Sequence, residues 1–401
     1  MALFDRFRKQ KATPPRRRSY AGANTGRLFA DFLSSTRSSD SELKPALRII
    51  RNRCRELARN DEYVRRYLGL LKTNVVGPTG VNLQAKARNA DGSLDAPGNK
   101  IVENAWAAWG KRGQCTADGR LSFTDAQRLF VEALARDGEV LVRFVSGFSN
   151  RDRFAIEFVE ADLLDEELNT KAENGNRIRM GVEVDDFGKA VAYHLLRDHP
   201  GDQEFATGYS RRHTRVPADQ MLHLFLPERA HQTRGAPMLA AAMSSLKILH
   251  GYREAELVAA RVAASKMGFI TSPDGEGYTG DDLENTNSPV MSAEPGSFEQ
   301  LPQGMDIKLF DPTHPTSAFA DFNKAVLRGI ASGLGVSYAS LASDLESVNY
   351  SSIRQGSLEE RDFYKTLQQF MIDHFVEPVF HAWLRQSMTA GGLPLPMSKY
   401  E

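Results

Sequence analysis

Residues 235–267 read GAPMLAAAMSSLKILHGYREAELVAARVAASKM, a stretch with a helical pattern and a proline near its first position. An unbroken helix here would be about 45 Å long, far beyond the three turns of an average helix. One face carries bulky apolar side chains, and alanines keep the other faces slim enough for close packing. The bulky residues are Leu239, Met243, Leu246, Leu249 and Tyr252. The stretch predicts either a buried core helix or half of a stalk.

A second long helix is predicted from residue 317, and its apolar period ends in a glycine-rich segment near residue 334. Between the two helices, residues 268–316 are acidic and dense in glycine, proline, asparagine and aspartate. Short strand candidates lie there at residues 298–301 and 307–310. The chain is therefore predicted to run out along one helix, form a small tip and return along the other.

Residues 40–234, upstream of the first long helix, combine helical and strand patterns. The first part of this region has a helical period and is predicted to form several helices. The last of them is capped near Ser122 or Thr124 and closed by Gly138. After Gly138 the period becomes strand-like. This region is predicted to be one mixed domain, and the fold class is α+β.

A hairpin is predicted within this domain. Residues 177–184 and 190–196 form its two arms, joined by the turn Asp185-Asp186-Phe187-Gly188. Each arm is predicted to be a single strand.

Residues 340–352 are polar and follow neither period, so they are predicted to be a loop. Ser357 and Glu360 fit a capping box at the entrance of the helix that follows. Pro378 is expected to kink or break this helix, because proline lacks the donor that the helix needs. Residues 353–401 are therefore predicted to be a kinked C-terminal helix.

Charge is segregated along the chain although its 51 basic and 51 acidic residues balance. Residues 1–60 hold fifteen Lys or Arg against five Asp or Glu, whereas residues 271–311 hold nine acids against one base. Residues 1–39 lack a sustained period and are predicted to be a flexible basic arm. Basic clusters often contact phosphates, but a solvated tail would have the same composition.

No cofactor, metal site or membrane span is predicted. Cys54 and Cys115 stand far apart in unrelated contexts, which supports neither a disulfide framework nor a metal site. No run approaches the roughly 18 consecutive apolar residues of a membrane helix.

Several short blocks of sequence occur once each along the chain, and their order is more specific than any single block. They are Arg59–Tyr63, Asn74–Gly77, Asp137–Val140, Gly181–Asp185, Ala192–His194, Gln232–Pro237, and Val348–Ser352 followed by Arg354. In this order, over residues 51–384, the set resembles the portal protein family of lambda-type bacteriophages, the head-tail connectors.

The resemblance implies a portal fold whose parts match the segments predicted above. The parts are a wing at 40–234, stem helices at 235–267 and 317–339, a clip at 268–316, a tunnel loop at 340–352 and a C-terminal helix at 353–401. It also implies a crown region, which is expected to be short or absent here.

The resemblance further implies a non-enzymatic ring, most often of twelve subunits, at one vertex of the virion. Its channel would conduct double-stranded DNA during packaging and ejection. Its implied partners are the terminase large subunit, head-completion or adaptor proteins, and capsid and scaffold proteins. Assembly would take place in the host cytoplasm.

Candidate functional residues follow from these parts. The tunnel loop and DNA channel would use Asp344, Glu346, Asn349, Tyr350, Ser351, Ser352 and Arg354. The clip would dock partners through Asp274, Glu276, Asp281, Asp282 and Glu284. Lys266 and Lys324 would line the stem. Acidic or neutral linings suit passage, because each neutralised phosphate would hold a moving duplex.

Two other functions remain open from the sequence. A monomeric nucleic-acid-binding adaptor would use the arginine-rich helix between Arg48 and Arg66. A serine or metal hydrolase would combine Ser351 or Ser352 with a histidine, but no nucleophile elbow, zinc motif or Walker lysine loop accompanies them.

Overall fold

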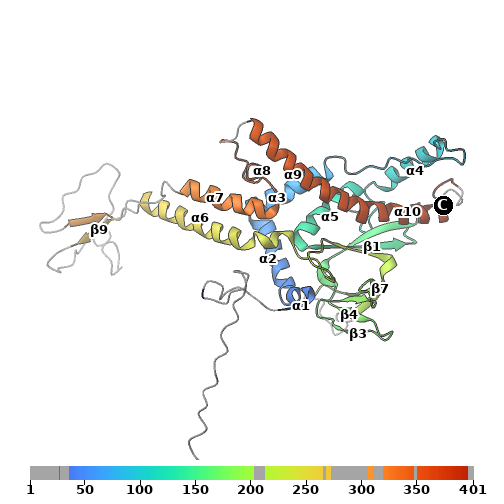
Figure 1. Ribbon diagram of the computed structural model, residues 1–401, viewed down its shortest axis with the longest axis horizontal. Coiled ribbons are helices and arrows are strands. Elements are labelled where there is room, and N and C mark those ends of the chain that lie inside the picture. Colours follow the sequence, from blue (N-terminus) through green and yellow to red (C-terminus); the bar gives the residue numbers. More distant parts are fainter. Residues whose placement is uncertain are drawn as a thin grey trace, which may run out of the picture.

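The computed structural model describes residues 27, 36–202, 213–264, 268–271, 306–309, 319–346 and 350–395. Two long helices, α6 (Met243–Ala264) and α7 (Phe319–Leu334), lie side by side and project from the rest of the molecule (Figure 1). We call this pair the stalk. The other helices and two of the sheets form what we call the body. The described part of the chain is a mixture of helices and antiparallel sheets, which confirms the predicted α+β class.

The body begins with three helices, α1 (Ser39–Leu43), α2 (Leu47–Asn60) and α3 (Glu62–Leu71). Asp61 separates α2 from α3 because its carboxylate accepts from the backbone N–H groups of Tyr63 and Val64. A π-helical turn (η3, Lys72–Val76) extends α3.

Two further helices follow, α4 (Ala96–Trp109) and α5 (Phe123–Asp137). Ser122 and Asp125 form a capping box at the start of α5, and Gly138 ends it in the left-handed conformation, with φ of 87°. Both predicted ends of α5 are confirmed.

The larger core lies between these helices and a three-stranded sheet of order β2-β1-β8. Its strands are β1 (Glu139–Ser146), β2 (Phe154–Val159) and β8 (Met221–Phe225), and both pairings are antiparallel. A short 3₁₀ turn (η4, Ala161–Leu163) follows β2. The core also takes in side chains from α7 and from the C-terminal helices, such as Ile330 and Trp383.

A five-stranded antiparallel sheet carries a second, smaller core. Its strands are β3 (Thr170–Lys171), β4 (Arg177–Arg179), β5 (Val182–Val184), β6 (Ala190–Leu196) and β7 (His213–Pro217), and the 3₁₀ turn η6 (Ala218–Gln220) follows it. The hairpin of β5 and β6 around residues 185–188 is confirmed.

The single strand predicted over residues 177–184 is wrong. It is two short strands that pair with each other around a turn at Met180 and Gly181. Both turn residues have positive φ, 46° and 83°, which is the backbone of a tight hairpin turn. A strand period cannot reveal such a turn when an apolar methionine occupies its first position.

The first stalk helix starts later than predicted. Pro237 has an extended backbone, and a 3₁₀ turn (η7, Met238–Ala241) precedes α6. The 22 residues of α6 give a length of about 33 Å rather than 45 Å. The predicted stripe is confirmed where Leu239, Leu246 and Leu249 are buried.

At the far end of the stalk, β9 (Gly268–Thr271) pairs with β10 (Asp306–Leu309) (Figure 1). The second strand matches the candidate at residues 307–310. The other candidate, at 298–301, lies outside the described residues.

The chain returns along α7 and continues through α8 (Tyr338–Ala342), α9 (Tyr350–Met371), a π-helical turn (η8, Ile372–Val376) and α10 (Glu377–Thr389). The loop predicted at 340–352 is thus only partly a loop. Residues 340–342 belong to α8 and residues 350–352 to α9, whereas residues 343–346 are not helical.

The capping box predicted at Ser357 and Glu360 is wrong, because α9 already begins at Tyr350. The Glu360 carboxylate instead accepts from Ser337, Ser340 and Tyr364, so it faces α8. The expected interruption at Pro378 takes the form of η8, directly before the first turn of α10 in which Pro378 sits.

Candidate functional site

The stalk joins the body at a buried ion pair between Arg234 and Glu139, which we call the junction. The guanidinium donates to both oxygens of the carboxylate, with Nε at 3.0 and 2.9 Å. Its two terminal nitrogens also donate to the carbonyls of Leu164, Met180 and Ala161. Arg234 has no exposed surface, so these contacts are what satisfy its donors.

Two more side chains surround the same carboxylate. Arg51 on α2 donates to Glu139 Oε1 at 2.7 Å, and His223 Nε2 on β8 lies 2.9 Å from Oε2. Burial alone would raise the pKa of Glu139, but Arg234, His223 and Arg51 hold it well below its ordinary value. The junction therefore binds α2, β1, β8 and the entrance to the stalk to one ionised carboxylate.

Two glycines let the backbone segments meet at the junction. A Cβ on Gly235 would lie 2.1 Å from the carbonyl oxygen of Gly138, and a Cβ on Gly138 would lie 2.4 Å from the backbone of Ala236. Neither position has room for any side chain. These glycines belong to two of the blocks that carry the family resemblance, and the structure brings those blocks into contact.

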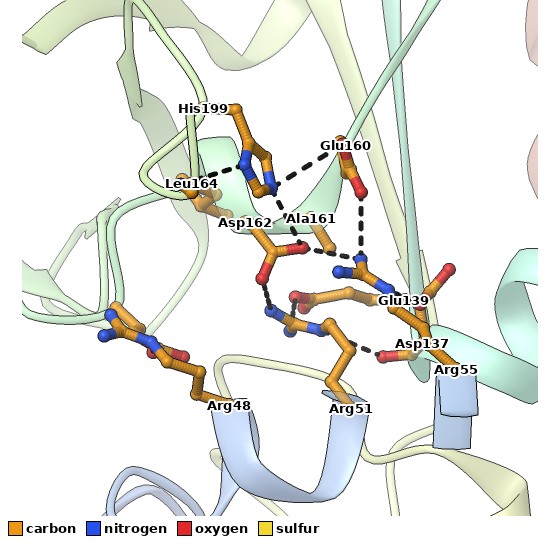
Figure 2. Close-up of polar contacts among 12 residues, drawn as sticks. Arg48, Arg51, Arg55, Asp137, Glu139, Glu160, Ala161, Asp162, Leu164 and His199 are labelled. Atoms are coloured by element: carbon orange, nitrogen blue, oxygen red, sulfur yellow. Dashed lines mark hydrogen bonds and ion pairs between the residues drawn. The ribbon is translucent and has the colours of Figure 1, made fainter. Parts of the chain in front are cut away.

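A row of arginines on α2 extends this network (Figure 2). Arg55 pairs with Asp137 at 2.7 Å and with Asp162 at 2.5 Å, and Arg48 pairs with Glu166. Figure 2 shows Arg51 and Arg55 directed from α2 toward these acids. Arg66 donates to the carbonyl of Ser340. The adaptor function needs arginines that face solvent. Arg48, Arg51 and Arg55 on α2 and Arg66 on α3 are engaged within the chain, whereas Arg53, Arg59 and Arg65 are exposed.

Glu160, Asp162 and His199 are close enough to share a cation in the described part of the chain, with ligand atoms within 4.8 Å of one another. Arg55 already lies 2.5 Å from Asp162 and 3.4 Å from Glu160 (Figure 2). A guanidinium in that position opposes a second cation, so the cluster fits ion pairing better than metal binding.

The structure brings three of the predicted channel residues together. Lys324 on α7 reaches toward Asp344 and Glu346, which follow α8, and its Nζ is 3.6 Å from a carboxylate oxygen of each. We call this group the clasp. Asp344 also accepts from the Tyr338 hydroxyl at 2.8 Å and from the backbone N–H of Glu346 at 3.0 Å.

These contacts shift two pKa values. The Glu346 backbone N–H, the Tyr338 hydroxyl and Lys324 lower the pKa of Asp344 below its ordinary value. Burial and the neighbouring Asp344 carboxylate raise the pKa of Tyr338 to about 12. Asp344 is therefore ionised and Tyr338 is a donor at neutral pH.

The other predicted residues lie elsewhere. Arg354 is exposed on α9, one turn after the first residues of that helix. Tyr350, Ser351 and Ser352 lie in the first turn of α9, and their side chains are outside the described part of the structure. Asn349, Lys266 and the five clip acids at 274, 276, 281, 282 and 284 also lie outside it.

Histidines of the body contact carboxylates, as a triad histidine also would, but the serines of the hydrolase alternative do not lie on a nucleophile elbow. His194 lies 3.1 Å from Glu183, and His213 lies 2.7 Å from Asp165. Ser351 and Ser352 belong to a helix rather than to a sharp strand-to-helix turn.

Both helices of the stalk have side chains that are exposed in the single chain. On α6, Ile248 and Leu257 are 68% and 67% exposed, and Val258 is also exposed. On α7, the exposed positions include the small residues Ala325, Gly329 and Ser332, but also Phe322 and Arg328. Ile248 and Leu257 are nine residues apart, two and a half turns, so they project from opposite sides of α6.

Sequence reasoning missed the junction. The signal was present, because Glu139 and Arg234 stood inside the quoted blocks, but their pairing spans 95 residues.

No helix in the described part of the chain is long and apolar enough to cross a membrane.

A family model described as "Phage portal protein, lambda family" matches residues 25–368. A "Probable portal protein" of Halomonas phage phiHAP-1 is 42% identical over 351 residues, which cover 86% of this chain and 68% of that protein. "Portal protein B" of Escherichia phage lambda is 24% identical over 417 residues, 94% of this chain and 77% of that protein.

Similar solved structures include the neck of an empty GTA particle, with 15% identity and a TM-score of 0.45, covering 84% of this chain and 82% of that one. A chain from the virion of a native gene transfer agent has 15% identity and a TM-score of 0.44, covering 84% and 81%.

Proposed function

The chain belongs to the lambda family of phage portal proteins, and from this membership we propose that it forms a ring at one capsid vertex and conducts double-stranded DNA. In this ring the body is the wing, α6 and α7 are the stem, residues 268–316 are the clip, and residues 340–352 contribute the tunnel loop. The terminase motor supplies the energy for packaging, and head-completion and tail proteins dock later. The ring assembles in the host cytoplasm and remains in the virion.

The exposed apolar side chains of α6 support the ring proposal. Ile248, Leu257 and Val258 lie within three turns of α6 and face solvent in the single chain. Burying each such side chain stabilises an assembly by about 1.5–3 kcal/mol. A closed ring uses two different patches on each subunit, and Ile248 and Leu257 project from opposite sides of α6.

The native mass of the purified chain tests ring formation. We expect a particle of about twelve 44.6 kDa chains with a central hole in electron micrographs. A stable monomer at physiological ionic strength, with tight and salt-sensitive DNA binding, would support the adaptor function instead.

DNA conduction is tested separately. The acidic side chains after α8 suit a lining that lets a duplex slide, because they neutralise no phosphates. Deleting residues 344–349 should leave the ring intact and impair DNA packaging or retention in assembled particles. Packaging at the normal level with this deletion would remove the loop from the mechanism.

A further inference from the structure

Lys324 is the contact through which the stem holds the segment 343–346. Its ammonium lies 3.6 Å from Asp344 and 3.6 Å from Glu346, so one cation faces two carboxylates. Arg328, one turn further along α7, lies over the ring of Tyr338 at 5.6 Å from its centroid. The same side of α7 thus contacts both α8 and the residues that follow it.

The base of this segment is fixed independently of Lys324. Ser337 and Ser340 donate their hydroxyl protons to Glu360, and Tyr364 donates to the same carboxylate at 2.6 Å. The side chain of Leu341, on α8, is buried. The start of the segment is therefore anchored to α9. Asp344 is also held by the Tyr338 hydroxyl, so among the described contacts it is the Glu346 carboxylate that depends on Lys324.

The geometry of the clasp is that of a contact that can be exchanged. A direct ammonium–carboxylate hydrogen bond measures about 2.7–2.9 Å, and both clasp distances are longer. The Glu346 side chain is 84% exposed and that of Lys324 is 31% exposed, so solvent and ions reach both. Exposed pairs of this kind are weak and are screened by salt.

We infer that the phosphates of duplex DNA compete with Asp344 and Glu346 for Lys324, so that a duplex in the channel releases the segment 343–346 from the stem. A duplex carries about one negative charge per 1.7 Å, which presents many competitors to one ammonium. Lys324 is then a positioning residue that couples the presence of DNA to the position of the loop. This inference rests on the proposed function, because it needs DNA beside the stem.

The first arm of the test needs no DNA. Hydrogen exchange of the peptide that contains Glu346 is measured by mass spectrometry in the full chain at low salt, because the amide of Glu346 is bonded to Asp344. We expect Lys324→Gln to raise its exchange rate about two- to fivefold and Lys324→Arg to preserve it. The control Lys365→Gln removes an exposed lysine that pairs with Asp362 on α9. Equal rates in Lys324→Gln and the control would overturn the clasp.

The second arm adds a short DNA duplex, with sodium chloride at equal ionic strength as the reference. The duplex should raise the exchange rate in the unmodified protein and in Lys365→Gln, and should change nothing in Lys324→Gln. A structural role of Lys324 alone would leave exchange insensitive to the duplex in every variant, which would overturn the competition. Failure of this inference can be distinguished from failure of the proposed function. The latter would appear as a monomeric native mass, and the first arm does not depend on that mass.

Discussion

At the scale of single residues, Glu139 has no exposed surface and is surrounded by Arg51, Arg234 and His223. A carboxylate in such a place is stable only because its charge is balanced and its oxygens accept hydrogen bonds. Its loss would leave the buried guanidinium of Arg234 without a counter-charge, whereas Arg51 would keep Asp162 at 3.5 Å.

We therefore expect Glu139→Gln to lower the free energy of unfolding by about 3–5 kcal/mol, since one partner of a buried pair is removed. Urea denaturation measures this change. The matched control is Glu157→Gln on β2, whose carboxylate pairs with Arg143 at the surface and should be worth about 0–1 kcal/mol. Similar losses in both variants would contradict a special role for the junction.

The same residue predicts a dependence on pH. The pKa of Glu139 is well below its ordinary value of 4.5, so its ionised form stabilises the folded state fully above that pH. The difference in unfolding free energy between the unmodified protein and Glu139→Gln should stay constant from neutral pH down to about 4.5 and shrink below it. A difference that already shrinks between pH 7 and 5 would contradict the lowered pKa.

Which residues could be found from sequence depended on how local their partners are. Asp344, Glu346 and Lys324 were named from sequence, and the structure places them together because only the short helix α8 separates α7 from residues 343–346. Glu139 and Arg234 could not be paired, because nothing in a single sequence says which strand start meets which helix entrance.

At the scale of elements, the stalk leaves the body through the close approach of Gly138 and Gly235. Gly138 has φ of 87°, and Gly113 has almost the same φ, 83°, with no atom near the position of a Cβ. Comparing substitutions at these two glycines therefore separates the cost of backbone strain from the cost of a steric clash.

We expect Gly113→Ala to cost about 1–2 kcal/mol through the left-handed backbone alone. Gly138→Ala should cost more than about 4 kcal/mol, because a backbone segment must also move. Urea denaturation compares the two, and soluble yield replaces it if Gly138→Ala does not fold. Equal costs would mean that the junction can open without penalty.

Elements with local signals were predicted well. Ser122 and Gly138 delimit α5 as expected, because capping depends on side chains within one turn. The same chemistry misled at Ser357, since a serine three residues before a glutamate also fits inside a helix when tertiary contacts, here to Ser340 and Tyr364, engage the glutamate.

At the scale of the whole molecule, ring formation should depend on the exposed apolar side chains of α6. Ile248→Asp should lower the native mass toward that of a single chain, because each interface loses about 1.5–3 kcal/mol, more than tenfold in affinity. Light scattering measures the mass.

Leu94→Asp is the matched control, because Leu94 is also exposed but lies in the body between α3 and α4. Its ring should be unchanged. A ring that survives Ile248→Asp would place the interface elsewhere.

The division into parts predicted from sequence stays a proposal, and the packing shows what a linear division cannot express. Phe375 and Trp383, from the end of the chain, lie in the same core as Trp106 and Phe130. Sequence patterns identify the apolar face of a helix but not the surface that covers it, so the return of α10 onto the body was not predicted.

That return gathers all three tryptophans of the protein into one place. Trp106 stacks on Trp109 with ring centroids 4.8 Å apart, and Trp383 meets Trp106 edge to face at 5.1 Å. Intrinsic tryptophan fluorescence therefore reports on this one core, to which α4 contributes Trp106 and Trp109 and α10 contributes Trp383. Tryptophan emission will follow unfolding of that core, but it will not report changes in the stalk or the clasp, which need an attached fluorescent dye.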